Sequence, residues 1–464
     1  MRNKTEIPKT AETSEFPREI YADRRHRLAA AVRKKTGGGV VILETAPEKY
    51  RNRDSDFPYR HDSDFYYLTG FSEPGATLVM VVGKNSSETI LFCRPKDLER
   101  EIWDGLRLGP DAAPMTLGVD TAHSNITIDS KIPELLGNQN AIYTRIGGHP
   151  EQSQQLHQWL DKVRGLARSG VTTPAALFDV ESIVHEMRLF KDAHEINIMR
   201  QAGKIAALGH IKAMQISQGG LREYHLEAEL LHTFRHLGAE SVAYNSIVAA
   251  GANACVLHHR AGNTLLKDGD LCLIDAGCEL HGYASDITRT FPINGQFSSA
   301  QKAVYEIVLA AQEAAIGVTQ VGRDFQAPHD AALKIITQGL LDLGLLDKKV
   351  IGGLETALET KAYQRFYMHR TSHWLGMDVH DVGQYRELES DLTPKPWRIL
   401  KEGMVLTIEP GIYIRKADDI DAKYWDIGIR IEDDALVTSG NCELMSREVP
   451  VTVSEIEYLM KHTS

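Results

Sequence analysis

Two aspartates stand where buried β-strands are expected. The stretch CLIDAGCELHGYASDITRTF, residues 272–291, begins with an apolar run that ends on Asp275, and Asp286 opens a second β-rich run. If the stretch is a hairpin with its turn near residues 279–282 and an even-numbered loop, both aspartates lie on one face, about 5–8 Å apart. Carboxylates that merely end a strand and cap a turn are the alternative explanation.

Two glutamates in later segments show the same anomaly. Glu409 interrupts the run MVLTIEPGIYI just before turn residues, and Glu432 follows the alternating segment DIGIRI. Because side chains alternate along a strand, Arg430 and Glu432 share the face opposite to the isoleucines. Such a face is usually exposed to solvent. However, acidic side chains occur among β-forming residues in three separate segments, and this repetition favours a shared pocket.

Four carboxylates in one apolar pocket require cations. Repulsion and loss of water would otherwise raise their pKa values until some of them took up protons. Two divalent ions balance four negative charges, and ions held about 3.5–4 Å apart lower the pKa of bound water to near 7. Oxygen ligands with at most one imidazole favour Mn²⁺, with Fe²⁺, Co²⁺ or Zn²⁺ as substitutes. The set therefore indicates metal-assisted hydrolysis.

One histidine ligand is expected from the stretch YMHRTSHWLGMDVHD, which contains His369, His373 and His380. Their spacing leaves open which of the three binds metal. His369 and His373 would share a face only in a helix, and Gly376 disfavours a helix there. The motif HExxH does not occur, which disfavours a mononuclear zinc protease.

The elements that must hold these residues occupy the last two thirds of the chain. Helices are predicted at 192–216, 222–237, 299–317 and 327–345, and β segments at 270–292, 404–415 and 427–438. Ser298 and Gln301 form a capping-box pattern before the third helix. This order predicts an α+β domain with a curved antiparallel sheet.

The first third of the chain mixes strands and helices like a compact α/β domain. Strands are predicted at GGVVILETA, DFYYLTGF, ATLVMVVG, ETILFCRP and AIYTRIG, and helices at DRRHRLAAAVRKK and QSQQLHQWLDKVRGLA. The turn-rich stretch ARSGVTTPAAL is the predicted linker. The predicted divisions are a flexible tail at 1–15, an N-terminal α/β domain at 16–177 and a catalytic domain at 178–464.

Composition limits the partners of the protein. The chain of 464 residues carries 52 basic and 63 acidic side chains, and a net charge of -11 disfavours nucleic acid and anionic membranes. Five cysteines without a CxxC pair indicate a reducing compartment. The polar N-terminus and the absence of a long apolar run predict neither a signal peptide nor a membrane span. We therefore expect a cytoplasmic enzyme.

Several segments resemble one enzyme family. LHHRAGNTLLKDGDLCLIDAGCELHGYASDITRTFP, HRTSHWLGMDVHDVG, GMVLTIEPGIYI and GIRIEDDALVT are similar to the Xaa-Pro aminopeptidases (aminopeptidase P) of the creatinase and methionine aminopeptidase superfamily. YRHDSDFYYLTGF and REIWDGLRLG resemble that family's N-terminal domain. The resemblance covers nearly the whole chain from about residue 16. It implies a pita-bread catalytic fold preceded by a smaller creatinase-type α/β domain.

The resemblance also implies a ligand set. Asp275 matches the bidentate ligand of the first metal, and Asp286 and Glu432 match the carboxylates that bridge both metals. His373 and Glu409 match ligands of the second metal. The resemblance thus selects His373 from the three histidines whose spacing left the choice open.

Further matches concern the substrate. His258 in VLHH matches the family's substrate-facing histidine, and its neighbour His259 is the weaker alternative. His369 and His380 match two other active-site histidines, and Arg430 matches an arginine that supports the ligands.

The family's assembly has counterparts in the sequence as well. Trp103 matches a tryptophan that can approach the site of a neighbouring subunit, and the family implies a homo-oligomer, a dimer or tetramer. The segment 383–403 is longer than the family's usual connection, which implies an altered rim of the site and an intact ligand set.

The implied reaction is hydrolysis of the bond between an N-terminal residue and a following proline by a metal-bridging hydroxide. Glu409 would carry a proton to the prolyl nitrogen, and His258 and His380 would bind the substrate and the developing oxyanion. A proline lacks an N–H and has a fixed φ, so general peptidases fit it poorly.

Several alternatives remain at this level. A prolidase, which cleaves only Xaa-Pro dipeptides, would use the same ligands. A non-catalytic binding protein or a metal-free creatinase-like hydrolase is disfavoured because all five ligand positions are kept. A glycosidase with paired carboxylates would not explain the fourth acid and the histidine.

Overall fold

The computed structural model describes residues 17–147 and 150–462, and the chain forms two compact units. One unit ends at Met187 and the other runs from Arg188. The sequence placed this division between 177 and 178. The structure places it later because residues 176–179 form a strand of the first unit's sheet. The tail predicted at 1–15 lies outside the described residues.

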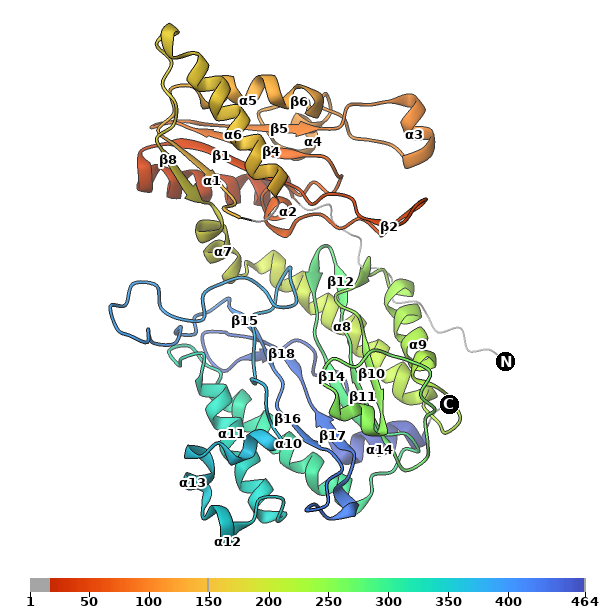
Figure 1. Cartoon of the computed structure of the whole chain (residues 1–464). Helices are drawn as coiled ribbons and strands as arrows, with labels where there is room; N and C mark the ends of the chain where they lie inside the picture. The colour runs from red at the N-terminus through yellow and green to blue at the C-terminus, as the bar shows by residue number, and fades with distance from the viewer. Residues whose placement is uncertain (1–16, 148–149, 463–464) are drawn as a thin grey trace. The chain divides into compact units, whose positions relative to one another are not determined.

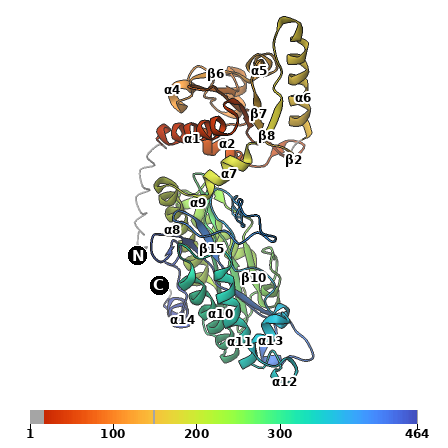
Figure 2. The same cartoon turned by 90° about the vertical axis from the view of Figure 1, so that its left-hand side faces the viewer.

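The N-terminal unit is built on a six-stranded mixed sheet with the strand order β6-β5-β4-β1-β7-β8. Its strands are β1 (Gly39–Glu44), β4 (Thr77–Val82), β5 (Ser87–Cys93), β6 (Thr121–Ser124), β7 (Ala141–Thr144) and β8 (Ala176–Asp179). The helix α1 (Arg18–Thr36) lies on the opposite side of this sheet from α5 (Ile128–Leu136) and α6 (Pro150–Gly165) (Figure 2). Trp159 of α6 packs on alternate apolar residues of β1, which explains why that face is buried.

One predicted strand of this unit is a helix. The segment DFYYLTGF lies mostly in α2 (Ser63–Thr69), although its aromatic residues are typical of strands. The Asp62 carboxylate accepts a hydrogen bond from the Phe65 N–H and so begins the helix. Gly70, with φ of 66°, ends it in the left-handed conformation. The capping residues therefore overrode the local β-propensity.

The catalytic unit contains several small antiparallel sheets, in agreement with the prediction of antiparallel pairing. Their strands are β9 (Ser241–Val242), β10 (Ile247–Ala250), β11 (Leu271–Asp275), β12 (Cys278–Leu280), β13 (Tyr283–Ala284), β14 (Thr288–Pro292), β15 (Val405–Ile408), β16 (Gly411–Ile414), β17 (Ile427–Arg430), β18 (Asp433–Leu436) and β19 (Glu443–Leu444). The sheet orders are β10-β11-β14, β13-β12-β9, β15-β18-β19 and β16-β17.

Four long helices of this unit match the predicted ones. They are α8 (Ala193–Ile216), α9 (Glu223–His236), α10 (Ser299–Val318) and α11 (Ala327–Asp342). In Figure 1 α8 lies beside β12 and α9 beside β10, while α10 lies beside β16 and α11 packs against α10. The predicted capping box of Ser298 and Gln301 is present. Among the described residues no helix is long and apolar enough to cross a membrane.

The start of the catalytic unit supplies counterions to a buried carboxylate. Arg188 Nη2 lies 2.7 Å from Asp381 Oδ1, and Lys191 Nζ lies 2.9 Å from Asp381 Oδ2. Burial alone would raise the pKa of Asp381, but the two cations keep it below its usual value. The group fixes the backbone directly after His380.

A second buried ion pair joins β14 to β18. The Arg289 guanidinium is fully buried and donates to Asp433 Oδ1 at 2.8 Å and to the Glu432 carbonyl at 2.7 Å. Burial would raise the pKa of Asp433, but Arg289 and Arg447 hold it below the ordinary carboxyl value. The pair joins β14, which follows Asp286, to β18, which follows Glu432.

Arg289→Met should therefore destabilise the catalytic unit strongly. Removing one partner of a buried pair leaves an undercompensated charge and typically costs about 3–5 kcal/mol. At about 2–4 °C per kcal/mol for a unit of this size, the melting temperature should fall by roughly 10 °C. Thermal unfolding followed by circular dichroism measures this, with Lys302→Met as the control because Lys302 pairs with Glu306 on the exposed side of α10. Equal melting temperatures for the two variants would contradict the expectation.

Candidate metal centre

The hairpin that carries the two aspartates has the even register that the sequence allowed. Asp275, the last residue of β11, pairs with Thr288 of β14. His281 and Gly282, with φ of 49° and 77°, form the two-residue turn that closes the inner part of the hairpin. Asp286, two residues before Thr288, therefore lies on the same face as Asp275. The two aspartates are diagonal neighbours across the ladder.

A tyrosine hydroxyl lies between these aspartates. Tyr244 Oη is 2.5 Å from Asp275 Oδ1 and also contacts Asp286 Oδ1. A hydroxyl has one proton and can donate to only one of the two oxygens. The second oxygen needs a proton of its own or a cation, so the arrangement is short of positive charge.

The two glutamates approach from interruptions in the other ladders. Glu409 follows β15, and its N–H donates to the Thr371 carbonyl at 2.8 Å. Glu432 lies between β17 and β18, where its N–H donates to the Thr288 carbonyl and its Oε2 accepts from Thr288 Oγ1 at 2.6 Å. Glu432 is only 2% exposed, so this face of the segment is buried and not solvated as the alternative reading allowed.

His373 is the histidine that meets these carboxylates. Its Nε2 lies 3.5 Å from Asp286 Oδ2 and 3.6 Å from Glu409 Oε1. Its Nδ1 lies 3.0 Å from the Trp374 carbonyl, an acceptor that orients the ring with Nε2 toward the acids. Asp286, His373 and Glu432 each offer a ligand atom within 4.8 Å of the others. They could hold a metal ion together.

The electrostatics of the pocket favour a bound cation. Burial raises the pKa values of Asp286 and Glu432, and neighbouring carboxylates raise them further. Burial also raises the pKa of Glu409 to about 7. Burial opposes a charged His373, yet Asp286 and Glu409 raise its pKa to about 9. Four oxygen-donor side chains and one imidazole of this kind suit divalent metal ions.

Arg430 supports one of the aspartates. Its Nη2 donates to Asp275 Oδ2 at 2.6 Å, its Nη1 to Tyr413 Oη at 2.9 Å, and its Nε to Thr288 Oγ1 at 3.1 Å. The same tyrosine hydroxyl lies 2.8 Å from His369 Nε2. Burial and the charge of Arg430 lower the pKa of His369 to about 3, so the imidazole is neutral.

The remaining histidines reach the same pocket. The ring of His380 stacks on that of His373, with centroids 4.0 Å apart. Burial and the neighbouring His373 and His258 lower the pKa of His380 to about 4. A cavity of about 830 Å³ is lined by every predicted site residue except Trp103. Trp103 belongs to the N-terminal unit, on α3 (Leu98–Asp104), and its side chain is 83% exposed.

Sequence reasoning missed three polar residues of the site. Tyr244 contacts both aspartates, Tyr413 joins Arg430 to His369, and Thr288 binds Glu432. Thr288 could have been found, because it lies two residues after Asp286 on the same strand face. Nothing in the local sequence distinguishes the two tyrosines from core aromatic residues.

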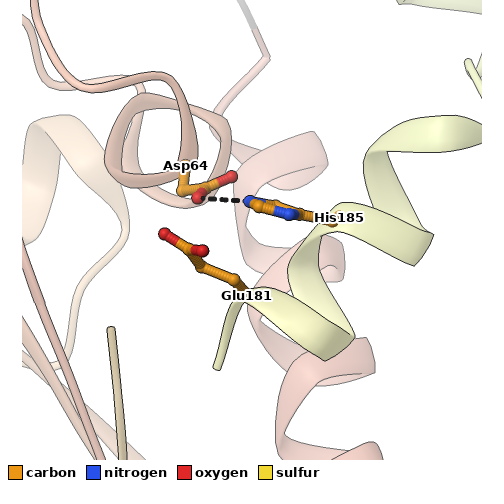
Figure 3. Close-up of side chains that lie close together, drawn as sticks. All are labelled: Asp64, Glu181 and His185. Atoms are coloured by element: carbon orange, nitrogen blue, oxygen red, sulfur yellow. Dashed lines mark hydrogen bonds and ion pairs between the residues drawn. The ribbon is translucent and has the colours of Figure 1, made fainter. Parts of the chain in front are cut away.

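A second group of ligand-type side chains lies in the N-terminal unit. Asp64, Glu181 and His185 point toward one another, the last two from α7 (Glu181–Leu189) (Figure 3). Arg145 already compensates both carboxylates: its Nε lies 2.5 Å from Glu181 Oε1 and its Nη2 lies 3.5 Å from Asp64 Oδ2. This group is therefore an ion-pair network, and we assign no metal to it.

Comparisons with known proteins agree with this geometry. Metallopeptidase family M24 matches residues 197–439, and the aminopeptidase P N-terminal domain matches residues 21–143. The Xaa-Pro aminopeptidases of Haemophilus influenzae and Escherichia coli are each 42% identical to this chain, over 96% of it and 98% of their own lengths.

Solved structures are similar over the same extent. Aminopeptidase PepP of Pseudomonas aeruginosa superposes with a TM-score of 0.92 at 46% identity, covering 97% of this chain and 99% of that one. Zinc-substituted aminopeptidase P of Escherichia coli, in complex with product, gives a TM-score of 0.92 at 41% identity, covering 97% of this chain and 100% of that one. Both units of the chain thus have counterparts in one kind of enzyme.

Proposed function

Because this chain belongs to metallopeptidase family M24 and carries an aminopeptidase P N-terminal domain, we propose that it hydrolyses the bond between an N-terminal residue and a following proline. It is a metallo-aminopeptidase, and its α+β catalytic unit has the pita-bread fold. The observation that carries the proposal is the convergence of four carboxylates and His373 on one cavity. The near full-length similarity to Xaa-Pro aminopeptidases favours this function over a prolidase.

The proposed ligands divide between two divalent ions. Asp275 would hold the first, His373 and Glu409 the second, and Asp286 and Glu432 both. When bound, the ions supply Lewis-acid polarisation of the scissile carbonyl and water of lowered pKa. The oxygen-rich donor set supports Mn²⁺ as the native metal, with Zn²⁺, Co²⁺ or Fe²⁺ as possible substitutes.

The chain's own groups bind the peptide and move the proton. Glu409, which lines the cavity with its Oε1 3.6 Å from His373 Nε2, would take a proton from the attacking water and give it to the prolyl nitrogen. His380 is neutral at pH 7 and can hydrogen-bond the developing oxyanion, while His258, which lines the same cavity, binds the substrate. His369 and Arg430 act through Tyr413 and Asp275. Together they fix the orientation of Asp275, the proposed ligand of the first metal.

We expect a Pro-second tripeptide to separate this function from its rival. With Mn²⁺ present, Xaa-Pro-Xaa should release its first residue, and the dipeptide Xaa-Pro should be a much poorer substrate because it lacks the peptide beyond proline. Product analysis by mass spectrometry measures both, with Xaa-Ala-Xaa as the matched control peptide. Turnover of the dipeptide alone would establish a prolidase instead.

Assembly and location are part of the proposal. Four large apolar side chains on and just after α3 are 80–87% exposed, namely Leu98, Ile102, Trp103 and Leu106. Apolar surface of this kind supports a homo-oligomer, a dimer or tetramer, in which Trp103 meets a second copy of the chain. All five cysteines are unpaired, which supports a cytoplasmic location.

A further inference from the structure

A buried glutamate outside the metal centre binds both ends of one loop of the cavity. Glu223 is the first residue of α9 and is 0% exposed. Its Oε1 accepts from the Ala250 N–H and from Asn253 Nδ2, both at 2.9 Å. Its Oε2 accepts from His259 Nε2 at 2.9 Å and from the Gly262 N–H at 3.0 Å. All four donors belong to the segment 250–262.

The same segment carries His258 into the cavity. His258 lies between the donors at 253 and 259, and it lines the same cavity as the carboxylates. Among the described residues its imidazole makes no hydrogen bond, whereas that of His259 is bound to Glu223. This difference explains why the first of two adjacent histidines is free for a ligand and the second is not.

The start of α9 reinforces this attachment. The Glu223 N–H donates to the Thr264 carbonyl at 3.2 Å, and the Tyr224 N–H donates to the Gly262 carbonyl at 3.3 Å. Asn253 Nδ2 also reaches Thr264 Oγ1 at 3.0 Å. Burial would raise the pKa of Glu223, but the hydrogen bonds it accepts keep it below the usual value, so the group is charged. A charged acceptor with four donors is a strong and directional attachment.

We propose that Glu223 is a positioning residue for the peptidase reaction, which sets the location of His258 by fixing both ends of the loop that presents it. The inference rests on the proposed function, because it takes His258 as a group that binds the peptide. It goes beyond that function in assigning a role to a side chain that touches neither metal ligands nor substrate.

Glu223→Gln tests the inference with little change in volume. The amide retains one acceptor oxygen, and in either orientation its NH₂ faces a backbone N–H, that of Ala250 or that of Gly262, so at least one donor is left without an acceptor. We expect kcat/KM on a Pro-second tripeptide to fall roughly 10- to 100-fold, with an unchanged metal content. Glu227→Gln is the matched control and should keep the wild-type rate, because Glu227 lies on the same helix and makes no hydrogen bond to the loop among the described residues.

A double-mutant cycle separates positioning from a general loss of structure. If Glu223 acts through His258, then Glu223→Gln should cost less than about 2-fold when added to His258→Ala. An equal fold-decrease in kcat/KM in the wild-type and His258→Ala backgrounds would overturn the inference. A wild-type rate for Glu223→Gln would overturn it as well. Should Glu223→Gln fail to fold, His259→Ala removes one bond and leaves three, and the same cycle applies to it. A wild-type enzyme inactive on the tripeptide would instead overturn the proposed function, and the inference with it.

Discussion

Asp286→Asn should reduce kcat/KM on a Pro-second peptide by roughly 1,000-fold or more, which corresponds to about 4 kcal/mol. Asp286 is buried, lies diagonal to Asp275, and is 3.5 Å from His373 Nε2. The substitution keeps the shape of the side chain and removes a negative charge, so the side chain can no longer serve two cations with two anionic oxygens. We expect fewer than two metal ions per chain.

Metal analysis and steady-state kinetics on the same preparation measure both effects. Asp342→Asn is the control, because Asp342 is a carboxylate at the surface that pairs with Lys348. The control should keep the metal content and the rate of the wild type. An Asp286→Asn enzyme with two ions and an unchanged rate would rule out a bridging role for this residue.

Removal of metal should make stability depend on pH in an unusual direction. In the metal-free protein burial raises the pKa of Glu409 to about 7, so stability contributed by the neutral carboxyl is lost as pH rises from about 4.5 to 7. The pKa of His373 is raised to about 9, so the stability from its charged form is present below about 6.5 and lost as pH rises through 9. Both groups therefore favour the metal-free fold at lower pH.

The measurable quantity is the difference in melting temperature between metal-loaded and metal-free protein. Bound divalent ions compensate the carboxylates and require a neutral His373, so the difference should widen from pH 6 to pH 8 by several degrees. Taking the difference at each pH cancels the titration of groups outside the metal centre. A difference that stays constant or narrows over this range would count against a metal site built on these residues.

The long helices and the hairpin could be predicted because their signals are local. Helical spacing over 16 or more residues predicted the bounds of α8, α10 and α11 closely. The capping pattern of Ser298 and Gln301 predicted where α10 begins. The even loop between Asp275 and Asp286 was one of two possibilities, and the choice depended on the turn at His281. A turn with positive φ at both positions is hard to foresee when the first residue is histidine.

The parts that could not be predicted depend on tertiary contacts. Tyr244 belongs to the site only because its hydroxyl reaches two aspartates from another segment. Local propensity misassigned α2, since a cap at Asp62 outweighed the aromatic run. Spacing alone could not choose among the three histidines; the resemblance selected His373, and the fold places its Nε2 beside Asp286 and Glu409.

The buried carboxylate of Asp381 limits where a stable fragment that contains the catalytic unit can begin. Its two counterions, Arg188 and Lys191, precede the region 197–439 that the family model matches, and Arg447, a counterion of Asp433, follows it. A fragment trimmed to the matched region would leave Asp381 in its core without either cation, and Asp433 with Arg289 alone. The smallest self-sufficient fragment must therefore begin at or before Arg188 and extend past Arg447.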